Sequence, residues 1–181
     1  EVASTVNESL LMQHLLATET DPEMKKYLIN YYIEEFRTTL FRQTMFAEFE
    51  LASHREVEAG GVLTAEWLCE TYDALNKKYF GPALAEDEYI KYEWARIPHF
   101  YRGFYVYQYA TGYSAATAIS KKILTEGPQA RENYIEFLKS GSSDYPVELL
   151  KIAGVDMSGP EPIRMAMETF KSLVDELEKM L

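Results

Sequence analysis

Apolar side chains recur every three or four residues along most of the 181-residue chain, which is the period of an amphipathic α-helix. The first such stretch, 2–18, contains neither Gly nor Pro. The second begins after Asp21, an N-cap residue that is followed by Pro22 in the first helical position. Its apolar stripe continues for about thirty residues and stops before Gly60 and Gly61. We predict a helix over each stretch.

The rest of the chain keeps the same period, with short interruptions. The pattern predicts further helices at 64–80, 104–125, 128–141, 146–153 and 160–181. Small residues such as Ala115, Ala116 and Ala118 would let neighbouring helices approach 104–125 closely, so we expect this helix to be central and buried. No segment of useful length alternates apolar and polar residues as a β-strand does. The predicted fold class is therefore all-α, with 1–181 as a single helical unit.

The segment 82–102 has no sustained period, is acidic at first and then aromatic, and contains Pro98. We predict a structured loop with about one helical turn around 86–94. The acids Glu86, Asp87 and Glu88 are most simply a solvated turn, although a negative rim would also repel acidic peptides.

The charge balance and the single cysteine narrow the classes of partner and compartment. Lys and Arg number 18 against 29 Asp and Glu, a net charge of −11, which disfavours nucleic acid and anionic membranes as partners. Cys69 cannot form an intrachain disulfide and should be a small buried hydrophobe, so we expect a reducing, cytoplasmic location. No apolar run approaches the roughly 20 residues that span a bilayer. The chain begins without Met in the middle of a helical pattern, so we expect it to be part of a longer protein.

The histidines do not form a known catalytic motif by their spacing. No two of His14, His54 and His99 lie four residues apart, and none has a Glu three residues before it. His14 and His54 lie among apolar residues and are typical of packed or surface histidines rather than of metal ligands. Phosphate-binding, nucleophile-elbow and C-x-x-C motifs are also absent from the sequence. The residues alone therefore predict no complete active site.

The segment 98–113 is unusual because it holds five of the 14 tyrosines beside a histidine and an arginine. One interpretation is the packing face of an amphipathic helix. The other is a set of hydroxyl and imidazole donors that line a cleft, bind a peptide carbonyl or stabilise a developing oxyanion. Tyr105, Tyr109 and Tyr113 are four residues apart, which would place them roughly on one helix face.

Several runs of residues resemble one enzyme family over essentially all of the chain. The runs are EVASTVNE at 1–8, RIPHFY at 96–101, FYVYQYATGYSAA at 104–116, SSDYP at 142–146 and AGVDM at 153–157. Together they resemble the C-terminal part of the catalytic domain of oligoendopeptidase F, a family of zinc metallopeptidases related to thimet oligopeptidase. The resemblance implies the helical C-terminal portion of a zincin-type catalytic domain.

The resemblance also implies a metal ligand. Members of that family hold zinc with two histidines of an H-E-x-x-H helix and with a glutamate on the next helix. Glu1 matches the glutamate ligand, whereas the H-E-x-x-H helix is expected upstream of the first residue. Glu8 lies seven residues after Glu1, on the same helix face, and either orients a ligand or has a solvated or capping role.

The same resemblance implies a set of donors on the substrate side. His99, Tyr105 and Tyr113 match the family's catalytic donors, although the spacing from His99 to Tyr113 is slightly longer than in thimet oligopeptidase. The remaining residues of the pattern are expected to bind substrate: Tyr101, Gln108 and Tyr109.

The implied function is part of a zinc-dependent endopeptidase that hydrolyses short peptides and that works with the missing N-terminal part of the same enzyme. We expect the 181-residue chain alone to be inactive and not to bind zinc tightly, because it supplies at most one ligand, Glu1. The competing interpretation is a separate helical module that holds a peptide on its Tyr-rich face without cleaving it. The sequence upstream of Glu1 would distinguish the two.

Overall fold

The structure is a computed structural model that describes residues 1–85 and 87–181. Within these ranges the secondary structure is helical and contains no β-strand, which confirms the predicted all-α class. The residues pack into two compact units: unit 1 contains 1–37 and 111–181, and unit 2 contains 38–110. The expectation of a single helical unit over 1–181 stays a prediction.

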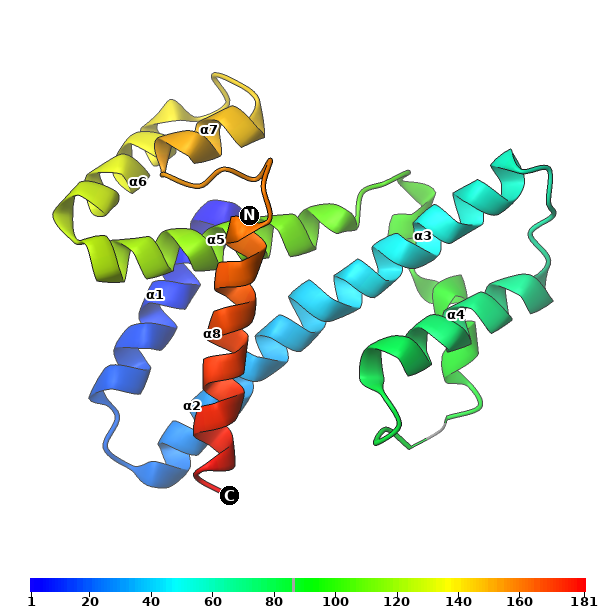
Figure 1. Ribbon diagram of the computed structural model, residues 1–181, viewed down its shortest axis with the longest axis horizontal. Helices are drawn as coiled ribbons and strands as arrows, with labels where there is room; N and C mark the ends of the chain where they lie inside the picture. The colour runs from blue at the N-terminus through cyan, green and yellow to red at the C-terminus, as the bar shows by residue number, and fades with distance from the viewer. Residues whose placement is uncertain (86) are drawn as a thin grey trace. The chain divides into compact units, whose positions relative to one another are not determined.

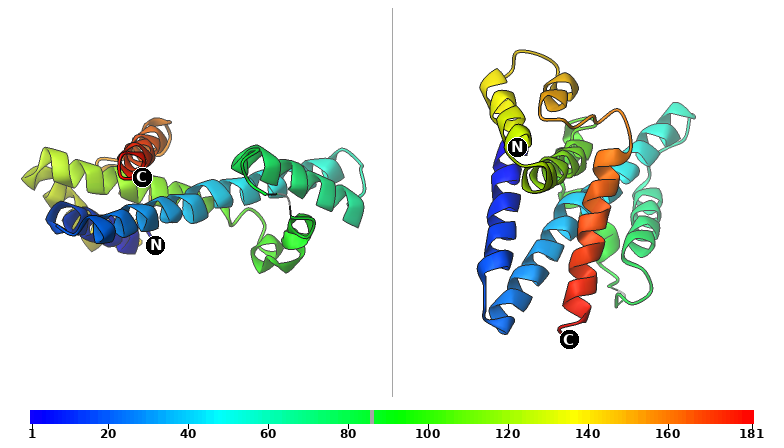
Figure 2. Two further views of the ribbon diagram at one scale, coloured as in Figure 1. Left: turned by 90° about the horizontal axis from the view of Figure 1, so that it is seen from below. Right: turned by 60° about the vertical axis from the view of Figure 1, so that its left-hand side comes forward.

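Unit 1 is built from helices around a core of small, aliphatic and aromatic side chains. Its helices are α1 (Val2–Thr18), α2 (Pro22–Glu35), the larger part of α5 (Tyr107–Glu126), α6 (Pro128–Ser140), α7 (Pro146–Ile152) and α8 (Glu161–Glu178). In Figures 1 and 2, α1 lies beside α2, α8 lies along α2, and α6 lies against α7. Every residue of 113–120 is buried, which confirms that the helix rich in small residues is central to this unit.

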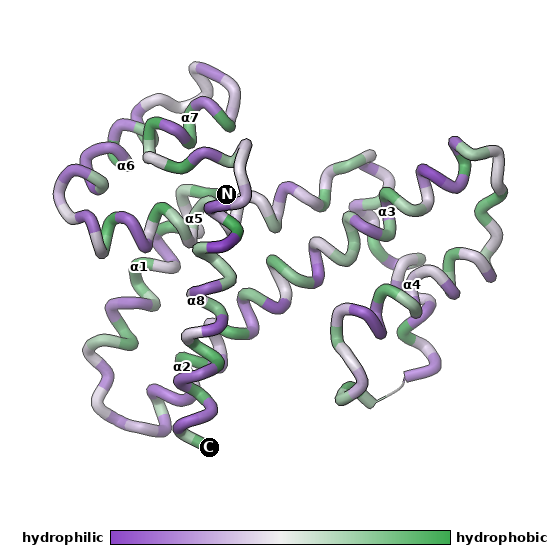
Figure 3. The backbone as a smooth tube through the Cα atoms, viewed as in Figure 1, coloured by the Kyte–Doolittle hydropathy of each residue, from purple (hydrophilic) through white to green (hydrophobic). Residues whose placement is uncertain are grey.

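The ends of these helices follow the signals in the sequence. The backbone N–H of Glu23 donates to Asp21 Oδ1 at 3.0 Å, so Asp21 caps α2 as predicted. Gly127 follows the last residue of α5 and has a φ of 77°. A residue without a Cβ adopts this left-handed conformation without steric cost, which favours glycine at the end of a helix. Figure 3 shows hydrophobic and hydrophilic residues alternating along α8, which buries Ala166 and Leu173. The predicted end of this helix at 181 is slightly too late, since α8 stops at Glu178.

Unit 2 is organised around two packed helices and two short 3₁₀ segments. Its elements are the greater part of the π-helical segment η1 (Phe36–Phe41), α3 (Arg42–Glu58), α4 (Ala65–Phe80), η2 (Ile90–Arg96) and η3 (Pro98–Tyr101). α4 packs against both α3 and η2. The core of the unit is half aromatic and consists of Met45, Phe46, Phe49, Tyr72, Leu75 and Val106. Cys69 is buried in α4, as predicted.

The long second helix of the sequence pattern is α2, η1 and α3 in succession, from Pro22 to Glu58. The π-helical turn was not predicted, because the apolar stripe passes through it without a change of period. The loop at 82–102 contains η2 and η3 rather than one turn at 86–94, and Glu86 lies outside the described residues. Asp87 and Glu88 are exposed, and Asp87 Oδ1 accepts the Tyr89 N–H at 2.8 Å, which is consistent with the predicted solvated turn.

Among the described helices, none combines the length and the apolar character that crossing a bilayer requires.

Candidate functional site

Three of the predicted site residues meet in unit 2, where they form what we call the ring cluster: His99, Tyr105 and Tyr109. The Tyr109 hydroxyl and His99 Nε2 are 3.3 Å apart and share a hydrogen bond. The ring of Tyr105 stacks on that of His99, with centroids 6.0 Å apart and planes inclined by 16°. Tyr105 and Tyr109 meet edge to face at 5.6 Å. The ring cluster therefore gathers an imidazole and two phenols in one place.

The ring cluster is assembled by a turn as well as by a helix. α5 begins at Tyr107, so Tyr105 precedes the helix, and the prediction that it shares a helix face with Tyr109 and Tyr113 is wrong. The reason is Phe104, whose φ of 57° interrupts the helical backbone that was predicted from 104 onward. The turn brings Tyr105 to His99, whereas Tyr109 reaches the cluster from the first turn of α5.

The other predicted residues of unit 2 and the remaining histidines are exposed. Tyr101 is 91% exposed. Gln108, which precedes Tyr109 of the ring cluster, is also exposed. His14 and His54 are also exposed, in agreement with surface histidines. The His54 ring packs on that of Phe104 with centroids 4.5 Å apart.

Tyr113 occupies a different environment, within unit 1. Its side chain is 5% exposed, and its ring meets Phe36 edge-on at 5.0 Å. Its buried hydroxyl has no hydrogen-bond partner among the described residues. It lines a pocket of about 230 Å³, the Tyr113 pocket, together with Glu8, Tyr32 and Glu35 among other residues.

Electrostatics keep the Tyr113 hydroxyl protonated. Burial raises the pKa of Tyr113, and Tyr32, Glu35 and Glu8 raise it further. Burial also raises the pKa of Glu35, and the charge of Glu8 adds to this effect. Since a protonated phenol can donate a hydrogen bond, Tyr113 presents a donor at the Tyr113 pocket. Sequence reasoning missed Glu35, because an acid on a long amphipathic helix is ordinarily a solvated residue.

The predicted metal ligand, Glu1, is not part of a complete metal site among the described residues. Glu1 is exposed and precedes α1, and its carbonyl oxygen accepts the Thr5 N–H at 3.1 Å. Within 1–85 and 87–181, no three His, Cys, Asp or Glu residues lie close enough to hold one ion. A catalytic zinc normally has three protein ligands. The described residues alone therefore do not fit a zinc ion, and Glu1 as a ligand stays a prediction.

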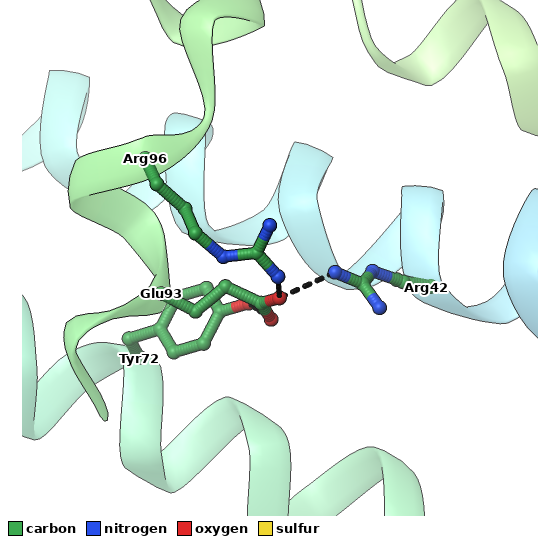
Figure 4. Close-up of polar contacts among 4 residues, drawn as sticks. All are labelled: Arg42, Tyr72, Glu93 and Arg96. Atoms are coloured by element: carbon green, nitrogen blue, oxygen red, sulfur yellow. Dashed lines mark hydrogen bonds and ion pairs between the residues drawn. The ribbon is translucent and has the colours of Figure 1, made fainter. Parts of the chain in front are cut away.

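Two buried acids in unit 2 were also missed by sequence reasoning. The side chain of Glu93 is 7% exposed and accepts a hydrogen bond of 2.6 Å from the Tyr72 hydroxyl. Its carboxylate also forms ion pairs with Arg42, at 2.5 Å, and with Arg96. Figure 4 shows these groups converging on its carboxylate. Glu50 is 3% exposed, and its Oε1 accepts the backbone N–H of Phe104 at 2.7 Å. For Glu50 a signal was present, since it lies four residues after the buried Phe46 and therefore on the same helix face.

Comparison with known proteins gives matches along the whole chain. Oligopeptidase PepF of Bacillus subtilis is 54% identical over 181 residues, and the oligoendopeptidase F homolog of Lactococcus lactis is 46% identical over 181 residues. The chain spans 27% and 30% of the length of these relatives. The crystal structure of oligoendopeptidase-F from Enterococcus faecium superposes with a TM-score of 0.96 at 53% identity, covering 99% of this chain and 34% of that one. The model of Peptidase family M3 matches residues 1–169, and the chain therefore belongs to this family.

Proposed function

We propose that this chain is part of a zinc-dependent endopeptidase that hydrolyses short peptides in the cytoplasm. Membership of Peptidase family M3 and the similarity to proteins named oligoendopeptidase F support the peptidase activity. Because the chain spans about a third or less of these relatives, the activity is proposed for the whole protein. The rest of that protein is then the principal partner of this chain, and short peptides are the substrates.

The observation that carries the proposal is the buried, protonated hydroxyl of Tyr113, which lines a pocket and has no partner among the described residues. A buried donor without a partner is costly for folding, so a donor of this kind is better explained by a group that it binds during function. We assign Tyr113, Tyr105 and His99 to the substrate carbonyl and the oxyanion that develops from it.

Tyr101, Gln108 and Tyr109 are assigned to the binding of the peptide substrate. Tyr101 and Gln108 are exposed, and the hydrogen bond between Tyr109 and His99 orients the imidazole. Glu1 is assigned as one zinc ligand. The zinc ion then needs two further ligands from the rest of the protein. Zinc dependence itself rests on the family resemblance.

The test uses the full-length protein and a quenched fluorescent peptide. We expect hydrolysis that a chelator abolishes, and we expect Glu1→Gln to lower both the zinc content after dialysis and the activity. Glu19→Gln is the matched control, because Glu19 follows α1 at its other end and its carboxylate accepts the backbone N–H groups of Thr20 and Asp21. Tight peptide binding without hydrolysis by the zinc-loaded protein would refute the proposal and favour the helical peptide-binding module.

A further inference from the structure

The segment that carries His99 and Tyr105 packs against α3 in unit 2. The ring of Phe100 packs against those of Phe46 and Phe49, with centroids 5.7 Å and 5.4 Å away. Glu50, the residue after Phe49 on α3, accepts a hydrogen bond from the backbone N–H of Phe104. The stretch 100–104 is thus held on α3 at both of its ends, and His99 and Tyr105 are the residues directly before and after it.

The contact between Glu50 and Phe104 joins two features that are each unfavourable alone. Glu50 is 3% exposed, and a carboxyl group removed from water is costly unless it is hydrogen bonded. Phe104 has a φ of 57°, in the left-handed region that residues with a side chain rarely adopt. The hydrogen bond of 2.7 Å from the Phe104 N–H to Glu50 Oε1 compensates both.

The backbone of Phe104 determines where Tyr105 lies. A left-handed residue reverses the local direction of the chain, and Tyr105 is the next residue, with its ring stacked on His99. If Phe104 relaxed into an extended or right-handed conformation, the Tyr105 ring would leave that position. The acceptor on α3 is thus linked to the His99–Tyr105 pair through the Phe104 backbone.

We propose that Glu50 is a positioning residue for the His99–Tyr105 pair, an inference that rests on the peptidase function proposed above. Glu50 acts through the Phe104 backbone and contacts neither substrate nor reacting atoms. Displacements of about 1 Å at catalytic groups can cost on the order of 10²-fold in rate. Loss of this acceptor should therefore appear mainly in kcat.

The test compares substitutions at two glutamates of α3 in the full-length protein. Glu50→Leu removes the acceptor, Glu50→Asp withdraws it by one methylene, and Glu50→Gln keeps an oxygen that can accept the same N–H. Glu48→Leu is the matched control, because Glu48 accepts two hydrogen bonds from α4, at 2.6 Å from Lys78 and 2.9 Å from Tyr79.

We expect kcat to fall roughly 10- to 100-fold in Glu50→Leu and Glu50→Asp, with KM changed much less. Glu50→Gln should restore most of kcat, and Glu48→Leu should lower stability while leaving kcat near normal. If Glu50→Leu does not fold, Glu50→Asp carries the test. Normal kcat in a folded Glu50→Asp protein, or no rescue by Gln, would overturn the proposal.

A second measurement does not depend on activity. Crystal structures of the Asp and Gln variants should show the φ of Phe104 leaving the positive region in the former only, together with a change from the 6.0 Å separation of the His99 and Tyr105 rings. Unchanged backbone and rings in the Asp variant would refute the positioning role. Absence of hydrolysis by the unsubstituted full-length protein would instead refute the peptidase function.

Discussion

Tyr113 and Tyr134 show how one residue type serves two purposes within unit 1. Both side chains are buried, but the Tyr134 hydroxyl donates to the carbonyl oxygen of Ala3 at 3.1 Å, whereas that of Tyr113 has no partner among the described residues. The first hydroxyl contributes to stability in the ordinary way. The second is a donor that folding does not use.

We predict that Tyr113→Phe in the full-length protein lowers kcat by roughly 10²–10³-fold, the cost of losing an oxyanion donor, with little change in KM. The ring contact with Phe36 remains, and no hydrogen bond to a described residue is lost, so the melting temperature should be equal or slightly higher. Steady-state kinetics and a thermal melt measure the two effects.

Tyr134→Phe is the stability control for this experiment. It removes a hydrogen bond, so the free energy of unfolding should fall by about 0.5–1.5 kcal/mol. A Tyr113→Phe protein that behaves like this control, with a lower melting temperature and near-normal turnover, would show that the Tyr113 hydroxyl is structural.

At the scale of the elements, acidic side chains connect α3, α4 and η2 within unit 2. Glu48 of α3 binds Lys78 and Tyr79 of α4, and Glu93 of η2 reaches both Arg42 of α3 and Tyr72 of α4. The two acids differ in exposure, since the side chain of Glu48 is 38% exposed and that of Glu93 only 7%. Solvent therefore screens the first contact far more than the second.

The Glu48 contact predicts a dependence of stability on pH. The hydrogen bond from Lys78 lowers the pKa of Glu48 below its ordinary value of 4.5, and that from Tyr79 lowers it further. Burial and the bond to Glu48 raise the pKa of Tyr79 to about 12. A lowered folded-state pKa means that the stabilisation is complete above the unfolded-state pKa and is lost as the pH falls through the folded-state value.

We therefore expect Glu48→Gln to lower the free energy of unfolding by about 0.2–1 kcal/mol at pH 7, the range of exposed ion pairs. The difference from the unsubstituted protein should shrink as the pH falls below about 4.5. Urea unfolding at a series of pH values measures it. A difference that grows in acid would contradict the sign of this argument.

The Glu93 contact predicts a larger effect. Glu93→Ala leaves the buried Tyr72 hydroxyl and the partly buried Arg42 guanidinium without their shared carboxylate, so we expect a loss of about 3–5 kcal/mol. Tyr72→Phe removes one hydrogen bond to that carboxylate and should cost about 1.5–3 kcal/mol.

A double-mutant cycle in urea separates these contributions. Because Glu93 and Tyr72 share one network, the two losses should not add. A cost below about 1 kcal/mol for Glu93→Ala would mean that the network contributes little to the stability of unit 2.

At the scale of the whole molecule, the chain corresponds to about 30% of the length of its relatives and supplies one proposed zinc ligand. We predict that the purified 181-residue chain retains no stoichiometric zinc after dialysis and cleaves no peptide, because a catalytic zinc normally needs three protein ligands. Metal analysis and a quenched fluorescent peptide measure both, with the full-length protein as positive control. Chelator-sensitive hydrolysis by the 181-residue chain would contradict the prediction.

The sequence alone determines most of the helices, because a helical hydrogen bond joins residues four apart and the apolar stripe follows the same local geometry. The start of α2 at Asp21 and Pro22 and the burial of the small residues of α5 could be predicted for this reason. The family resemblance could also be recognised from the sequence, since it depends on the order of residues and not on their contacts.

Tertiary structure decided what surrounds the candidate donors. The backbone N–H of Phe104, a residue with a positive φ, donates to Glu50, 54 residues earlier, and no periodicity within either segment encodes that hydrogen bond. Likewise, Tyr113 owes its raised pKa to burial and to acids on α1 and α2. Contacts over such sequence separations form only when the helices pack. The sequence therefore identifies the candidate donors, whereas the tertiary packing determines their geometry and protonation.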